Sequence, residues 1–564
     1  MQDNITIPIA YNRIGQRIGG LNKNDEPVGF SGQFSPYMKN FVVESSCIRK
    51  RLGYNKLGTN LPLSGTGAGL YKYVDATGVS HLIALTSTNA YEYNATLDAW
   101  DDISPETVRT VYTPDSITIQ TPDGQSLLVS EPASGTSFTG GEDNKFRFAV
   151  VTDSTAFTNN GGTAAVLTNG IDDLYFYEGN AGCRLATLTH AFPNFANCLD
   201  IVEFYNHFFL FNYNDGSQRA RGLAFAEAGD VTSWSGPTAS ATTLTDSVGS
   251  VSRALKLGLY LIIYSTESIS ICEYIGGSTI FSIPTVFYQA GLISPGAVWP
   301  FTDYHIFIGS DQRVHKYAGS NRSDDVGYRV DCALFSEMDY EHKDRIVAGY
   351  DSTRKKLYFF IPTPSSVTPK SAYVLSPDMY GEPWEYHEFA DTVCSMAVLE
   401  AKPEYYCDDT TEQTGYCDEA TDYCDSVYSQ SGAPICVFLS SDSYVYKLDE
   451  STGKDDDSDI TCEYQTEDIT VDEEITVDRW NWLSFVARSD AGTDVYLSYS
   501  TDDGKTWTFA ADSPISISEG WNTYRVPIDV ASRKIRIKFY ESSSSDFRLR
   551  ESVRVGYTTQ EERE

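Results

Sequence analysis

The chain has 564 residues, 41% of them hydrophobic, so it is long enough for several domains with buried cores. Its 78 acidic and 42 basic side chains give a formal net charge of −36. That balance argues against ordinary nucleic-acid binding, because lysine and arginine are needed to displace the counterions of phosphates. Aromatic residues make up 13% of the chain, and their preference for pleated surfaces predicts an all-β protein.

The N-terminal stretch MQDNITIPIAYNRIG lacks a basic region followed by an apolar run, so we expect no signal peptide. No apolar run approaches the roughly 18–20 residues that span a bilayer, and we expect no membrane segment. The 11 cysteines are scattered, which favours free thiols over a disulfide framework. These features are typical of a chain that folds in a cytoplasm.

Residues 1–60 do not show the pattern of a regular sheet, and we interpret them as an extended N-terminal arm with a few strands. The arm carries a cationic island, Arg49, Lys50 and Arg51, in an otherwise anionic chain. This island is either a solvated strand edge or an assembly site that docks an acidic neighbour or another copy of the chain.

Residues 67–104 predict a β-meander, with strands at 70–73, 81–85 and 90–93 and a short fourth strand around Trp100. Each run is apolar or aromatic and is bounded by glycine, asparagine, aspartate, serine or threonine. A sheet of this size cannot bury both faces alone, so we expect it to recur along the chain.

The hairpin pattern does recur from residue 61 to about 450, with spacings of 45 to 79 residues between strands anchored at His81, Phe148, His207, Tyr260, His305, Leu357 and Cys436. These spacings approach a propeller blade once insertions at about 105–145 and 403–431 are allowed. The sequence therefore predicts an irregular β-propeller of six or seven blades over residues 61–450. Two stacked sandwiches remain an alternative.

A cysteine-rich repeat lies in the second insertion, with the possible metal ligands Cys407, Asp408, Cys417, Asp418, Cys424 and Asp425. Its spacings match no familiar zinc or iron–sulfur arrangement, and it contains neither histidine nor a calcium-loop glycine turn. We interpret it as an acidic insertion and expect no metal and no cofactor.

After an acidic linker, residues 455–564 alternate apolar and polar side chains, which predicts a C-terminal antiparallel β-sandwich. One hairpin of this unit fits the Asp-box pattern through Ser500, Asp502, Gly504, Thr506 and Trp507, and it resembles the hairpin turns of sialidases and other glycan-acting propellers. The pattern is that of a structural turn. The sequence contains no nucleophile elbow, HExxH motif or P-loop, so we predict a protein that is not an enzyme.

Four N-terminal motifs together resemble virion proteins of short-tailed bacteriophages: residues 18–22 (IGGLN), 35–41 (SPYMKNF), 48–54 (IRKRLGY) and 69–73 (GLYKY). The family is the tail nozzle, also called tail tubular or packaged-DNA-stabilisation protein. The specific similarity covers about the first 105 residues.

The resemblance implies a homo-oligomeric ring, typically a hexamer, in the virion tail below the portal and adaptor ring, made in the host cytoplasm. Tail fibres or spikes would be further partners. Double-stranded DNA would pass through the ring without specific binding, and a loop from one of the insertions would gate the channel. Six copies would carry 6 × (−36) = −216 formal charges, a sign that repels the DNA backbone.

Two other functions remain open at this point. The aromatic content and the Asp box are compatible with a glycan-binding or glycan-cleaving propeller, such as a receptor-binding protein or depolymerase. The other is a bacterial surface or scaffold propeller, which the missing signal peptide disfavours.

Overall fold

The computed structural model describes residues 3–8, 20–25, 34–44, 47–58, 62–110, 128–132, 138–179, 183–277, 279–400, 434–448, 452–471 and 477–559. Strands make up 53% of the described residues and helices 3%, which confirms the all-β prediction. Its short helical segments are η1 (Asn160–Gly162), α1 (Asp331–Glu337) and η2 (Tyr340–Arg345). Among the residues described, no helix has both the length and the apolarity to cross a membrane.

The predicted meander forms the first of a series of antiparallel sheets. Strands of four to eight residues alternate with tight turns, as the placement of glycine and asparagine predicted. The first sheet contains β8 (Gly67–Val74), β9 (Ser80–Thr86), β10 (Ala90–Asn94) and β11 (Ala99–Asp102).

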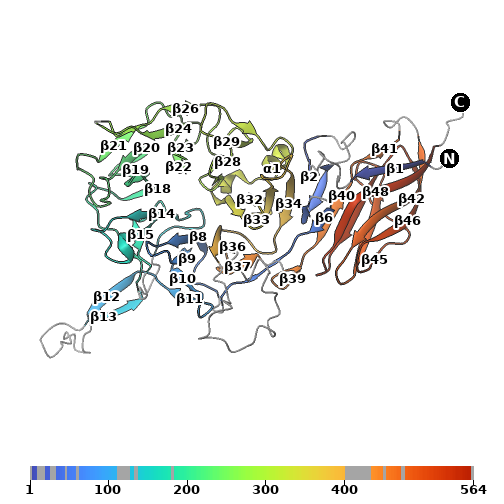
Figure 1. Ribbon diagram of the computed structural model, residues 1–564, viewed down its shortest axis with the longest axis horizontal. Coiled ribbons are helices and arrows are strands. Elements are labelled where there is room, and N and C mark those ends of the chain that lie inside the picture. Colours follow the sequence, from blue (N-terminus) through green and yellow to red (C-terminus); the bar gives the residue numbers. More distant parts are fainter. Residues whose placement is uncertain are drawn as a thin grey trace, which may run out of the picture.

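Five further sheets follow in chain order and lie around a common centre (Figure 1). The second contains β14 (Arg147–Thr152), β15 (Thr163–Thr168), β16 (Tyr175–Tyr177) and β17 (Ala186–Thr187). The third contains β18 (Asn197–Phe204), β19 (His207–Asn214), β20 (Gln218–Phe225) and β21 (Ser240–Thr243). The fourth contains β22 (Val251–Leu257), β23 (Tyr260–Ser265), β24 (Ile269–Tyr274), β25 (Phe281–Ser282) and β26 (Thr285–Phe287). The fifth contains β27 (Val298–Pro300), β28 (His305–Ile308), β29 (Val314–Tyr317) and β30 (Asp324–Asp325). The sixth contains β31 (Val347–Asp351), β32 (Lys356–Thr363), β33 (Ser366–Leu375) and β34 (Trp384–Glu388).

The seventh sheet combines both ends of this series. It contains β35 (Ser395–Glu400), β36 (Pro434–Leu439), β37 (Val445–Leu448), β7 (Tyr54–Lys56), β38 (Lys454–Asp455) and β39 (Ser458–Asp459). Here β7, which precedes the first sheet in the chain, pairs antiparallel with β37. The seven anchors predicted from the spacing fall in seven different sheets, in β9, β14, β19, β23, β28, β32 and β36.

Hydrophobic clusters connect neighbouring sheets. One joins the first and second sheets, and others join the second to the third, the third to the fourth and the sixth to the seventh. The first and seventh sheets share a cluster that includes Leu82 and Val437, and the Leu70 N–H donates to Ser395 Oγ across the same boundary. The first predicted insertion contains a two-stranded hairpin, β12 (Glu106–Thr110) and β13 (Leu128–Pro132), which projects from the ring of sheets (Figure 1).

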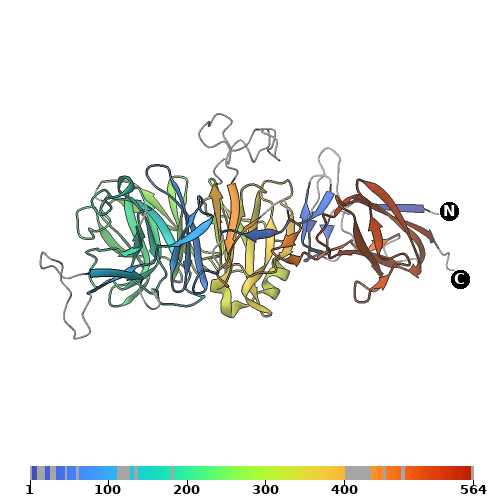
Figure 2. The same ribbon diagram turned by 90° about the horizontal axis from the view of Figure 1, so that it is seen from below.

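The C-terminal unit has two sheets packed face to face at the far end of an elongated molecule (Figure 2). One sheet has the order β46 (Asn522–Ser532), β42 (Asp478–Arg488), β48 (Arg548–Thr559), β6 (Cys47–Lys50) and β5 (Phe41–Val43), and β1 (Asp3–Pro8) also pairs with β48. The other contains β40 (Cys462–Gln465), β47 (Lys534–Glu541), β43 (Thr493–Ser500) and β44 (Thr508–Phe509), with β41 (Ile469–Thr470) pairing with β47 and β45 (Ile515–Ile517) with β43. It is continuous with the sixth sheet, since a strand of the N-terminal segment joins the two into one 13-stranded sheet. Phe485 and Phe539 meet between the two sheets with ring centroids 5.1 Å apart.

The described part of residues 1–60 does not form a separate arm. Besides β1, β5, β6 and β7, this segment supplies β2 (Gly20–Leu21), β3 (Phe34–Ser35) and β4 (Tyr37–Lys39). Strand β4 pairs with β34 of the sixth sheet on one side and with β40 of the C-terminal unit on the other. These strands are too short to enclose a core of their own, so they complete sheets that the rest of the chain begins. The sequence boundary at 455 also differs from the structure, because β38 and β39 belong to the seventh sheet.

Candidate functional site at the junction of the two units

The predicted docking island lies between the ring of sheets and the C-terminal unit, and most of its charge is buried. Only Arg49 is partly exposed, and its guanidinium lies 2.8 Å from a Glu44 carboxylate oxygen. Lys50 and Arg51 are 1% and 3% exposed. These two residues therefore cannot present a surface patch to a neighbour, because their charges are neutralised inside the chain.

Lys50 ties the end of β6 to the end of β47. Its Nζ lies 2.6 Å from Glu541 Oε2 and also donates to the carbonyl of Ser543. Glu541 accepts further hydrogen bonds from Thr493 Oγ1 and the Ser543 N–H. A buried pair of this kind is tolerated because nearly every polar atom in it has a partner.

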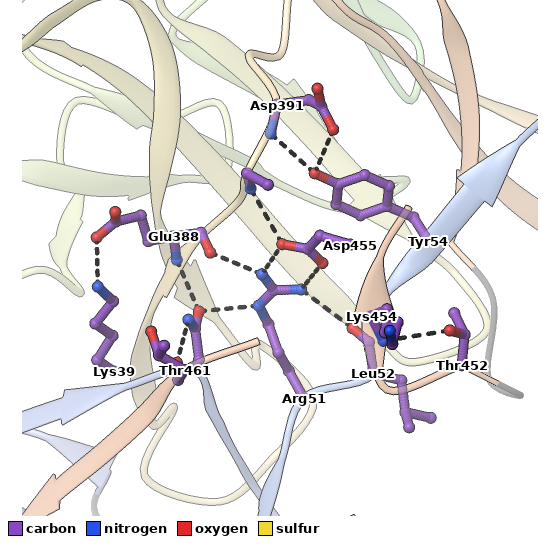
Figure 3. Close-up of polar contacts among 12 residues, drawn as sticks. Lys39, Arg51, Leu52, Tyr54, Glu388, Asp391, Thr452, Lys454, Asp455 and Thr461 are labelled. Atoms are coloured by element: carbon purple, nitrogen blue, oxygen red, sulfur yellow. Dashed lines mark hydrogen bonds and ion pairs between the residues drawn. The ribbon is translucent and has the colours of Figure 1, made fainter. Parts of the chain in front are cut away.

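Arg51 joins three chain segments through its whole guanidinium (Figure 3). Its two terminal nitrogens contact the two carboxylate oxygens of Asp455 at 2.7 and 2.5 Å. The remaining N–H groups reach Asn40 Oδ1 and the carbonyls of Glu388 and Leu52. Because a planar fork matches a carboxylate at two points, Arg51 fixes direction as well as distance between the units.

Tyr54 continues this network into the seventh sheet. Its hydroxyl donates to Asp391 Oδ2 and accepts from the Asp391 N–H, both at 2.9 Å (Figure 3). The ring packs between Phe389, Phe438 and Tyr446. Burial, followed by the Asp455 charge, raises the pKa of Tyr54 far above its ordinary value, so the hydroxyl stays protonated.

A third buried ionic group lies behind the junction. Lys356 Nζ donates to Glu385 and to Ser376 Oγ, and Glu385 also lies 3.3 Å from His387 Nε2. Burial lowers the pKa of His387 and favours the neutral ring. Burial opposes ionisation of Glu385, but the charge and hydrogen bond of Lys356 and the electrostatic contact and hydrogen bond of His387 together outweigh it and hold the Glu385 pKa below its usual range.

Two cavities flank the basic segment. One of about 250 Å³ is lined by Arg49, Arg51, Arg354, Lys356 and His387, with Tyr358 and Phe389 among the apolar walls. The other, of about 220 Å³, lies on the side of the C-terminal unit and includes Arg49, Lys50, Asp490, Asp546 and Arg548. Each cationic side chain in them has a carboxylate partner, so the geometry favours a structural joint.

The Asp box forms the local turn that its sequence predicts. Asp502 accepts from the Thr506 N–H and hydroxyl and from Ser500 Oγ, and the Gly504 N–H donates to Ser500 Oγ. These bonds hold the pKa of Asp502 down at about 2. Gly504 has φ +81°, and Trp507 lies under the ammonium of Lys538 at 4.4 Å. The polar side chains of Ser500, Asp502 and Thr506 are thus used within the turn, and Trp507 packs against the neighbouring β47.

The cysteine–aspartate repeat lies outside the described residues, so its six candidate ligands remain a prediction. Within the described ranges, no cluster of three or more histidine, cysteine, aspartate or glutamate side chains could hold a metal ion.

The first strands of three neighbouring sheets, β14, β18 and β22, bring together a small charged group. Asp200 on β18 accepts from the Ala254 N–H, and Arg253 on β22 donates to the carbonyl of Pro295. Burial raises the pKa of Asp200 and lowers that of Arg253 to about 10, and Arg147 adds a like charge beside Arg253. Glycoside hydrolysis normally uses two carboxylates about 5–10 Å apart, whereas one carboxylate and two guanidiniums meet here.

Comparisons with known proteins show no family. No family model matches the chain, and no curated protein matches it. Among solved structures, an exo-β-1,3-galactanase from Phanerochaete chrysosporium is 8% identical, with 67% of this chain and 98% of that chain aligned at a TM-score of 0.24. An arabinoxylan arabinofuranohydrolase of glycoside hydrolase family 43 from Bacillus subtilis is 12% identical over 88% and 96%, at a TM-score of 0.23. A family 4 carbohydrate-binding module is 14% identical over 18% of this chain and 61% of its own length, at a TM-score of 0.14. At these scores the similarities carry no argument about function.

Proposed function

We propose that the seven sheets form a closed seven-bladed β-propeller. Support comes from β7, which adds an N-terminal strand to the last sheet, and from the core that the first and seventh sheets share. Joining the two ends of the chain in one sheet closes such a ring without covalent linkage and leaves no exposed inner edge.

We further propose that the chain is a non-enzymatic structural subunit of a phage tail, which forms a ring-shaped conduit and gate for genome DNA below the portal and adaptor. The observation that carries this proposal is the position of the resembling motifs. Leu21 and Asn22, the strands around Tyr37 to Phe41 and the segment from Ile48 to Tyr54 all lie in the joint between the two units.

A joint of this kind suits a subunit that must keep its shape under force. The buried Arg51–Asp455 pair connects the C-terminal unit to the seventh sheet, and the buried Lys50–Glu541 pair joins the two sheets of the C-terminal unit, so the ring of sheets and the C-terminal unit are held in one orientation. A rigid, elongated subunit can keep its position in a symmetric ring while DNA moves through the centre. The net charge of −36 per copy opposes adhesion of the DNA backbone to the wall.

The mass of the purified chain, alone and mixed with a candidate adaptor ring, tests this proposal, together with negative-stain images. We expect a six-fold ring with a central hole, either alone or on the adaptor. A monomer or trimer that does not bind the adaptor ring would contradict the proposed conduit function.

Glycan binding is the second candidate function, and one surface feature favours it. Tyr205 and Tyr274 stack with ring centroids 4.7 Å apart and an interplanar angle of 16°, and both are more than 40% exposed. Exposed aromatic faces are suited to apolar faces of sugars. Binding to a host-polysaccharide panel, compared between the native chain and Tyr205→Ala/Tyr274→Ala, tests this role. Release of reducing ends would show cleavage.

A further inference from the structure

Three arginines gather on the outer face of the sheet that contains β46, β42 and β48. The opposite face of this sheet is the core, where Leu483, Phe485, Val526 and Val555 are buried. Ser484 on β42 pairs with Arg525 on β46 and with Arg554 on β48, and side chains at paired positions share a face. Arg550 follows on β48, opposite Val486. All three arginines are exposed.

Two of these guanidiniums are held in place by tryptophan rings. Arg525 Cζ lies 4.1 Å from the centroid of the Trp482 ring, and Arg550 Cζ lies 5.1 Å from that of Trp521. The Trp482 indole in turn lies on the backbone of Gly556, where an added Cβ would approach Trp482 within 2.2 Å. Stacking fixes the plane of a guanidinium while its N–H edge stays available to an anion.

Unlike other arginines of the C-terminal unit, these three have no carboxylate partner among the described residues. Arg479, Arg488 and Arg548 each pair with an aspartate, at Asp529, Asp490 and Asp546. Among the described carboxylates, none forms an ion pair with Arg525, Arg550 or Arg554. In a chain with a net charge of −36, this face is a local concentration of unneutralised positive charge.

We propose that this face, formed by Arg525, Arg550 and Arg554, is the contact surface for carboxylates of a second copy of the chain. The inference deepens the proposed ring and rests on it, because it assigns one side of the subunit–subunit interface. Charge complementarity supports the choice of partner, since every copy carries 78 − 42 = 36 more acidic than basic side chains. A face that meets a different surface of the next copy generates a ring or a filament.

The geometry argues against the other polyanions and against neutral sugars. The two tryptophan faces are covered by guanidiniums, so they are not open platforms for a sugar. DNA carries one charge per about 1.7 Å of helix, so three arginines would neutralise only a small part of a bound segment. Contact with a second copy is local and lies within about one Debye length of roughly 8 Å at physiological salt.

The test compares the native chain with Arg525→Glu/Arg550→Glu/Arg554→Glu by sedimentation velocity over a concentration series at 50 mM and 300 mM NaCl. The matched control is Arg219→Glu/Arg313→Glu/Lys355→Glu, which reverses three exposed cations on the ring of sheets. Both variants change the net charge by 3 × (−2) = −6, from −36 to −42. We expect self-association of the native chain and the control, on the order of 100-fold weaker association of the arginine-face variant, and weakening of the native assembly by salt. Thermal melts establish that both variants fold.

The outcomes separate this inference from the proposed conduit. If the arginine-face variant assembles like the native chain, the inference is overturned and a ring seen by electron microscopy still supports the conduit. If the native chain associates through this face but only as a closed dimer without a hole, the inference holds and the conduit fails. If the native chain stays monomeric and binds heparin or duplex DNA through the same arginines, the partner is an anionic polymer and the inference is wrong.

Discussion

Lys50 Nζ lies 2.6 Å from Glu541 Oε2, although 491 residues separate the two in the chain, and neither side chain is more than 1% exposed. The pair therefore joins the N-terminal segment to the last third of the protein inside the molecule. A buried charge without its partner is costly, whereas a buried pair replaced as a unit is often neutral.

Replacing Lys50 by methionine should destabilise the C-terminal unit by about 3–5 kcal/mol, because Glu541 remains buried and uncompensated. The double variant Lys50→Met/Glu541→Gln should recover a large part of that loss. Urea unfolding followed by tryptophan fluorescence measures both, and the double-mutant cycle gives the coupling. Additive losses in the two single variants would show that the pair contributes nothing beyond its separate residues.

Arg51→Lys should also destabilise the protein, by roughly 1–3 kcal/mol, because a lysine cannot reproduce the two-point contact with Asp455 or reach three further acceptors. Arg49→Lys serves as the control. Arg49 makes a partly exposed pair with Glu44, and its replacement should change the unfolding free energy by less than about 1 kcal/mol. Equal effects of the two substitutions would contradict the importance of the fork geometry.

Asp331, the first residue of α1, should make the stability depend on pH. Burial, followed by the Asp325 charge, raises its pKa to about 7 in the folded chain, and its Oδ1 has no hydrogen-bond partner among the described atoms. The folded state therefore holds a proton that the unfolded state releases between about pH 4 and 7, so stability falls as the pH rises through this window and levels off above it.

Asp331→Asn should remove this pH dependence. At pH 8 it should raise the unfolding free energy by on the order of 1 kcal/mol and the melting temperature by a few degrees, and at pH 4 it should change neither. Asp324→Asn, a change at an exposed aspartate on the nearby β30, is the control and should leave the pH profile unchanged. The melting temperature of both proteins is measured against pH by differential scanning fluorimetry. Parallel curves for the native chain and Asp331→Asn would show that Asp331 is not the source of the pH dependence.

The Asp box gives a prediction that separates a structural turn from a binding site. Asp502→Ala removes the acceptor for Ser500 and Thr506 and should lower the unfolding free energy. Polysaccharide binding, if the chain shows any, should stay the same at saturating ligand. A loss of binding with unchanged stability would mean that the box contacts a ligand.

The sequence predicted the parts of the fold whose signals are local. The meander at 67–104 and the seven strand anchors follow from apolar runs separated by turn residues, and both lie where the pattern placed them. The Asp box was predictable for the same reason, since its hydrogen bonds span at most four residues.

Partners distant in the chain leave no such signal. Lys50 and Arg51 gave the pattern of an exposed cationic island because their partners Glu541 and Asp455 lie 491 and 404 residues away, whereas Arg49 pairs with the nearby Glu44. The sequence also did not predict that β7 completes the seventh sheet, because a strand of three residues carries too little periodicity to indicate a distant partner. The outer arginines on β46 and β48 follow the alternation of their strands, but their shared face depends on strand order, which the sequence did not give.

Tyr54 should be the residue on which closure of the ring of sheets depends most. It lies on β7, which pairs with β37, and its ring is fully buried against two aromatic rings of the seventh sheet and one in the loop between β34 and β35. Tyr54→Ala leaves a large cavity and should cost about 3–5 kcal/mol. Tyr54→Phe keeps the packing but leaves the Asp391 N–H and carboxylate without the hydroxyl, and should cost about 1–2 kcal/mol.

Amide hydrogen exchange shows where the structure opens. With Tyr54→Ala, protection should fall in β37 and in β8, on both sides of the boundary between the seventh and first sheets, and stay unchanged in the third sheet. Loss of protection confined to β7 itself would mean that the first and seventh sheets hold together without it, and the proposed closure by this strand would be wrong.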